Sequence, residues 1–187
     1  MRVSQYHYHD SEWFPSLPKG DPSQLLLSFG GREFLQDDNI IAALKSGFPQ
    51  AENIGCTTSG EILSTEVYDD SLVVTAISMD HTPIVVKSVN ASAYANSFAA
   101  GIALSDQLEK AGLKYVLLIA DGQKVNGTEL VAGVTQGLPK GLLITGGMAG
   151  DGERFEETIV WHNDRVRAGE IVLCGFYGDA LRVGHGT

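Results

Sequence analysis

The order of apolar and polar positions along the chain predicts alternating strands and helices. Short apolar runs bounded by glycine, proline or charged residues are typical of buried strands. Such runs occur at 24–30, 71–79, 82–89 and 114–122, in "GLLITGG", and in "TIVWHN", "EIVLCGFYGD" and "LRVGHG". Because only two residues separate the runs 71–79 and 82–89, these two strands are predicted to form a hairpin. Residues 1–22, which are rich in aromatic residues and prolines, predict an irregular lead-in.

Three segments place apolar residues at the spacing of one helix face, over residues 37–47, 92–110 and 126–137. Each segment begins near side chains that can accept from free helix amides, namely Asp37 or Asp38, Asn90 or Ser92, and Asn126. Each segment ends at or near a glycine, a common helix stop. The chain therefore predicts three helices between its strands.

The order of these elements repeats along the chain. The "GFP" at residues 47–49 recurs as "GLP" at 137–139, and the apolar faces of the first and third predicted helices align at the same offset. We therefore expect one mixed α/β domain over residues 1–187, made of two related β-α-β-β-β halves at about 24–89 and 92–187. The second half carries an insertion that includes "WHNDRVR".

Duplicated units usually pack about a pseudo-twofold axis. We therefore expect helices that cover mixed or antiparallel sheets, and an α/β/β/α sandwich is one such arrangement. The axis would relate two loops rich in small residues, 55–61 and 145–151. These loops are predicted to lie close together and to line one pocket.

Charge and composition exclude several classes of binding partner and cellular location. The formal net charge is −10 without a block of like charges, which argues against nucleic acid and anionic membrane surfaces, because both require a basic patch. No apolar run approaches the roughly 20 residues of a membrane-spanning helix, and the N-terminus lacks a signal-peptide pattern. A cytoplasmic protein is expected. The two cysteines form no CxxC pair, so we expect free thiols and no structural zinc.

The loop "GCTTSGE" at 55–61 allows four interpretations. A phosphate-binding loop needs a helix directly after it, and a β-rich segment follows instead. A hydrolase could use Cys56 or a neighbouring hydroxyl only with a base nearby, and no histidine adjoins the loop in sequence. A purely structural role is a tight turn between strands.

The fourth interpretation, which we favour, is a ligand-binding turn. Small residues leave a concave space, and Glu61 or Asp151 could bind an amino group. No catalytic residue is predicted. The candidate ligand-binding residues come from both loops: Cys56, Thr57, Thr58, Ser59, Gly60, Glu61, Gly146, Gly147, Met148, Gly150 and Asp151.

Together, "GCTTSGEI", "GGMAGDG" and "RVGHG" make the chain, from about residue 24 to 187, resemble the N-terminal domain of the FIST family. The resemblance implies a sensory input domain of an intracellular signal-transduction protein rather than an enzyme. It implies a small polar ligand such as an amino acid. It also implies two partners, a C-terminal companion domain and a downstream signalling protein.

Some members of the family bind haem and respond to nitric oxide, so the resemblance also implies an alternative, a haem b sensor. Haem needs an axial ligand, most simply a histidine. His185 in "GHG" is the first candidate, followed by His162 and His81. Covalent c-type haem is excluded because the chain has no CxxCH motif.

Overall fold

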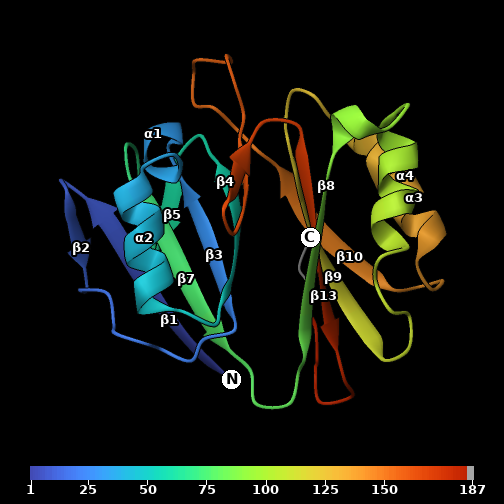
Figure 1. Cartoon of the computed structure of the whole chain (residues 1–187), viewed down its shortest axis with the longest axis horizontal. Helices are drawn as coiled ribbons and strands as arrows, with labels where there is room; N and C mark the ends of the chain where they lie inside the picture. Colours follow the sequence, from blue (N-terminus) through green and yellow to red (C-terminus); the bar gives the residue numbers. More distant parts are fainter. Residues whose placement is uncertain (185–187) are drawn as a thin grey trace.

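The computed structural model describes residues 1–184 and arranges them in four layers, helix, sheet, sheet and helix (Figure 1). Three clusters of buried apolar side chains hold the four layers together. One lies under each pair of helices, and the third lies between the two sheets. The expected mixed α/β class, with helices covering mixed sheets, is confirmed, and the layers form an α/β/β/α sandwich. No helix in residues 1–184 has the length and apolarity needed to span a membrane.

The first sheet has seven strands in the order β12-β11-β4-β3-β7-β1-β2. Only β3 and β4 are parallel, and all other neighbours are antiparallel. Helices α1 (Arg32–Leu35) and α2 (Asp38–Gly47) cover its outer face, and Asp37 caps α2 by accepting from the amide of Asn39. The strands are β1 (Arg2–His9), β2 (Glu12–Phe14), β3 (Leu25–Gly30), β4 (Glu52–Thr57), β7 (Leu72–Ser78), β11 (Val160–His162) and β12 (Arg165–Arg167).

The second sheet has four strands in the order β10-β9-β13-β8. Helices α3 (Ser97–Ser105) and α4 (Gly127–Gly137) cover it and pack closely on each other, since a Cβ on Gly133 would lie 2.2 Å from the carbonyl oxygen of Phe98. A 3-10 turn (Ala91–Ala93) precedes α3. The strands are β8 (Ile84–Asn90), β9 (Leu113–Ala120), β10 (Leu143–Met148) and β13 (Glu170–Tyr177). A separate small hairpin joins β5 (Glu61–Leu63) and β6 (Glu66–Tyr68).

The two sheets share a local strand arrangement. In β4-β3-β7-β1 and in β10-β9-β13-β8 the first pair is parallel and the next two pairs are antiparallel. In each set a helical segment connects the two parallel strands, α1 and α2 in the first set and α4 in the second. This correspondence agrees with the expected repeat, but it does not by itself confirm a duplication, which stays a prediction.

The predicted hairpin of 71–79 and 82–89 is wrong. Strand β7 lies in the first sheet between β3 and β1, whereas β8 lies at the edge of the second sheet and pairs with β13. The chain therefore crosses from one sheet to the other between Ser78 and Ile84. Both strands bury apolar side chains against different neighbours, and the short connection is compatible with either arrangement.

The ends of the chain also differ from expectation. Residues 1–22 contain β1 and β2, and β1 has a partner on each side, so the predicted irregular lead-in is wrong. The described part of "LRVGHG", residues 181–184, is not a strand. The helix expected over 92–110 is shorter, because Asn96 caps α3 by accepting from the amide of Ala99.

The insertion that contains "WHNDRVR" builds part of the other half's sheet. It forms the hairpin of β11 and β12, and β11 pairs with β4 in the first sheet. Its Trp161 is 1% exposed and packs in the cluster beneath α2. The largest side chain of the first half's core thus comes from the second half.

We predict that Trp161→Ala lowers the free energy of unfolding by about 3 to 5 kcal/mol, because it leaves a large cavity in a buried cluster. Val67→Ala, at a position that is 71% exposed, should lower it by less than about 0.5 kcal/mol. Urea denaturation followed by circular dichroism measures both values. A small effect of Trp161→Ala would show that the insertion does not support the first half.

Candidate functional site

The two loops singled out by the sequence lie against each other. The amide of Gly150 donates to the carbonyl oxygen of Thr57 at 2.8 Å, and the amide of Gly152 donates to that of Thr58 at 3.2 Å. The Gly152 amide also lies 3.1 Å from the Ser59 hydroxyl oxygen. The expectation that the loops lie close together is therefore confirmed, and backbone hydrogen bonds join them.

Glycine permits this approach. A Cβ on Gly150 would lie 2.6 Å from the Ser59 hydroxyl oxygen, so the Ser59 side chain would have to move to admit a larger residue there. Gly60 has φ of +137°, a conformation that residues with a side chain rarely adopt. These glycines explain why the sequence places small residues at the junction of the two loops.

Several candidate residues already bind groups within the protein. Glu61 is 3% exposed and accepts from the hydroxyls of Thr58 at 2.5 Å and Ser71 at 2.7 Å. The Thr57 hydroxyl accepts from the amide of Ile159 at 3.0 Å. Glu61 and Thr57 therefore hold the first loop in shape, with few atoms left for a ligand.

Asp151 plays the same role in the second loop. It is 4% exposed and accepts from the amides of Glu156 and Glu157 at 3.0 and 3.1 Å, and from Arg154 at 3.2 Å. Burial alone would raise the pKa of Asp151. The backbone hydrogen bonds and Arg154 outweigh burial, so the pKa lies below its usual range. Asp151 is thus ionised and bound within its own loop.

A hollow of about 560 Å³ opens where the loops meet, and we call it the acidic hollow. Asp69, Asp70 and Glu153 are exposed at its wall, and among residues 1–184 Arg154 is the only basic residue that lines it. An Arg154 nitrogen lies 3.9 Å from a Glu33 carboxylate oxygen. The lining residues are Gly31, Glu33, Thr58, Ser59, Gly60, Glu61, Asp69, Asp70, Gly152, Glu153 and Arg154.

Five residues of the acidic hollow were not predicted from the sequence, namely Glu33, Asp69, Asp70, Glu153 and Arg154. The first three come from α1 and from the segment after β6, which carry no motif. Only Glu153 and Arg154 offered a signal, because they directly follow the "GDG" of the second loop. Glu33, Asp69 and Asp70 lie at the hollow only because the tertiary fold brings their segments there.

A second hollow of about 430 Å³ lies on the other side of Thr58, and we call it the edge hollow. Its lining is mainly apolar. The hollow lies along β10, one of the two outer strands of the second sheet. The candidate residues Cys56, Gly146, Gly147 and Met148 come together here. Its lining residues are Phe29, Cys56, Thr58, Leu117, Ile119, Thr145, Gly146, Gly147 and Met148.

Comparison with protein families gives one match, to the FIST N domain, over residues 24–187. The chain belongs to the FIST family. A FIST domain is a sensory domain of signal-transduction proteins. A comparison with curated proteins finds no match. The match covers both halves and both loops, and it begins one residue before β3.

In this FIST N domain, the surroundings of Cys56 are not those of a catalytic nucleophile. Cys56 is 6% exposed, and burial raises the pKa of its thiol to about 12. A nucleophilic cysteine needs a lowered pKa, usually from a neighbouring cation. Within residues 1–184, no histidine lines either hollow. The loop therefore supports binding better than covalent catalysis.

The histidines proposed for haem differ in their surroundings. His162 lies 2.8 Å from the Ser88 hydroxyl oxygen through Nδ1 and 3.3 Å from a Glu52 carboxylate oxygen through Nε2, so both nitrogens have partners. His81 is an exposed residue in the connection between β7 and β8. His185 lies outside the described residues, so haem binding through it stays a prediction. Among residues 1–184 there is no group of three or more His, Cys, Asp or Glu side chains that could hold a metal ion.

We predict that iodoacetamide at pH 8 labels neither cysteine of the native protein in the time that fully labels the urea-denatured chain. With a pKa of about 12, roughly one Cys56 in ten thousand is a thiolate at pH 8. An ordinary thiol is about one quarter thiolate at this pH. Mass spectrometry of the alkylated peptides measures both sites. Rapid labelling of native Cys56 would revive the hydrolase alternative.

Proposed function

We propose that this FIST N domain senses a small polar ligand with a cationic amino group, most simply an amino acid, bound in the acidic hollow. The observation that carries the proposal is the charge of the hollow. Glu33, Asp69, Asp70 and Glu153 line it, and in the described part of the chain, residues 1–184, Arg154 is the only basic residue that does so. A concave site with a few polar groups in fixed positions is typical of small-ligand binding.

The contacts favour an amino acid over a simple amine. An ammonium group would donate charge-assisted hydrogen bonds to the exposed carboxylates of Asp69 and Asp70. The Arg154 guanidinium is 40% exposed and could bind the ligand's carboxylate. The Ser59 hydroxyl, whose oxygen lies next to the Gly152 amide, could donate its hydrogen to the same carboxylate. Glu61 and Asp151 support the site by holding the loops.

The position of the hollow suggests how a signal arises. Ser59 and Asp69 belong to the first half of the chain, whereas Gly152 and Arg154 belong to the second. A ligand that contacts both halves binds most tightly to one arrangement of the loops, and it shifts the population toward that arrangement. We propose that the C-terminal companion domain and a downstream signalling protein respond to this change. The exposed outer strand β10, beside the edge hollow, offers them access.

We expect a thermal-shift screen of amino acids to identify at least one that raises the melting temperature, because a ligand that binds only the native state stabilises it. For that amino acid, Asp69→Asn/Asp70→Asn should weaken binding about tenfold or more, since hydrogen bonds to charged groups each contribute about 1.5 to 3 kcal/mol. Isothermal titration calorimetry measures the dissociation constants.

The matched control is Glu12→Gln/Asp106→Asn, which removes two negative charges from exposed positions outside the hollow. It should leave the dissociation constant within about twofold, because exposed charges beyond a Debye length of about 8 Å are screened at physiological salt. Equal loss in both double variants would mean that net charge, and not the hollow, governs binding. An amino acid that binds the Asp69/Asp70 variant undiminished would contradict the proposal.

A further inference from the structure

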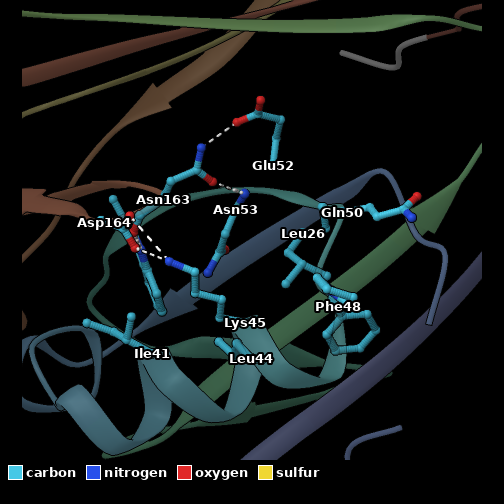
Figure 2. Close-up of a pocket in the computed structure, with 13 residues that line it drawn as sticks. Leu26, Ile41, Leu44, Lys45, Phe48, Gln50, Glu52, Asn53, Asn163 and Asp164 are labelled. Carbon is cyan, nitrogen blue, oxygen red and sulfur yellow. Dashed lines mark hydrogen bonds and ion pairs between the residues drawn. The ribbon is translucent and has the colours of Figure 1, made fainter. Parts of the chain in front are cut away.

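A separate hollow of about 330 Å³ lies at the opposite end of β4 from the two loops (Figure 2). It opens between the C-terminal end of α2 and the turn that joins β11 to β12. We call it the α2 hollow. It shares no lining residue with the acidic hollow or the edge hollow. The function proposed above makes no use of it.

The floor of the α2 hollow is apolar. Leu26, Leu44, Phe48 and Trp161 line it, and each is at most 2% exposed. These residues belong to the cluster that holds α2 on the first sheet, so the rest of the fold fixes their positions. A floor of this kind favours an apolar group on the ligand, because the ligand's burial removes apolar surface from water.

Hydrogen bonds fix the polar wall of the α2 hollow. Asn163 has φ of +54° in the β11–β12 turn, and its side-chain oxygen accepts from the Asn53 amide at 2.9 Å. The Asn163 amide donates to the Asn53 carbonyl oxygen at 2.8 Å, and its Nδ2 donates to Glu52 at 2.5 Å. The Trp161 indole N–H donates to the Asn163 carbonyl oxygen. The wall is therefore held in place without a ligand.

One donor in this wall has no partner. Asn53 is 8% exposed, and its Oδ1 accepts from the Ser28 hydroxyl at 2.7 Å. That hydrogen bond turns Asn53 Nδ2 toward the hollow, where the Asn53 side chain ends beside Lys45 in Figure 2. Among residues 1–184, no group accepts from Nδ2. Nδ2 is thus a free donor at the surface of the hollow, and it can donate to an acceptor that enters.

The rim carries two carboxylates, Glu52 and Asp164, and one ammonium group, Lys45. Lys45 Nζ lies 3.2 Å from an Asp164 carboxylate oxygen, and Glu52 accepts from Asn163. A ligand carboxylate would be repelled by this net negative rim, whereas a neutral carbonyl oxygen could accept from Asn53 Nδ2 without that repulsion. We infer that the α2 hollow is a second small-molecule site, for a compact apolar ligand that carries one neutral carbonyl group, such as an amide.

The test compares three probes of similar size, benzamide, benzoate and toluene, by titration of the ¹⁵N-labelled chain followed by NMR. We expect benzamide to shift the side-chain amide signals of Asn53 and the indole signal of Trp161. It should bind at least tenfold more tightly than benzoate or toluene. This comparison uses the unaltered protein, so it does not depend on the folding of any variant. Equal binding of benzamide and toluene, or the absence of benzamide binding at millimolar concentration, would overturn the inference.

The variant Asn53→Asp sharpens the test at pH 8. It keeps an oxygen to accept from Ser28 and replaces the free donor by an oxygen. Benzamide should bind it at least tenfold more weakly, and toluene should bind it as before. Gln50→Glu makes the same chemical change at an exposed lining residue and should alter benzamide binding less than twofold. Undiminished benzamide binding to a folded Asn53→Asp variant would overturn the inference. Because the probes differ from amino acids and the variant lies outside the acidic hollow, this result is independent of the sensing proposal.

Discussion

The arrangement of the candidate site depends on the backbone hydrogen bonds that join its two loops. Amides of Gly150 and Gly152 donate to carbonyl oxygens of Thr57 and Thr58, and they hold the end of one sheet against the end of the other. Each loop alone is a polar turn at the end of a strand. Joined, they bound two hollows that share Thr58, one acidic and one mainly apolar. A residue larger than glycine at position 150 would meet the Ser59 hydroxyl, and the Ser59 side chain would have to move.

A second connection runs between the halves. The hairpin of β11 and β12 lies in the second half of the sequence, yet it pairs with β4 and places Trp161 beneath α2. From the same hairpin, His162 reaches Ser88 on the second sheet. The two halves are thus joined at two places, at the loops after β4 and at the hairpin that pairs with β4. A ligand bound at the loops would therefore act on a structure in which the halves are already coupled.

The sequence predicts the strands and helices that are determined by the local pattern of apolar and capping residues. Strands β3 and β9 are short apolar runs, and α2 and α4 carry both an apolar face and a cap, so all four are expected. Strand pairing is decided by distant residues, and for this reason the pattern suggests a hairpin where β7 and β8 enter different sheets. Strand β1 alternates polar and aromatic residues beside prolines, and its pattern does not show that it pairs on both sides.

The same distinction applies to the site. The small residues of the loops mark a turn, and the predicted repeat led us to expect that the loops meet. Their carboxylates, Glu61 and Asp151, are bound within the loops, whereas three of the accessible acidic groups, Glu33, Asp69 and Asp70, come from segments without a motif.

The most direct test of the account is an amide NMR titration of the whole chain with an amino acid that raises its melting temperature. We predict that signals of Thr58 to Gly60 and of Gly150 to Gly152 shift together, with one dissociation constant. Shifts confined to one loop, or to residues away from both, would contradict a single site built by the two halves.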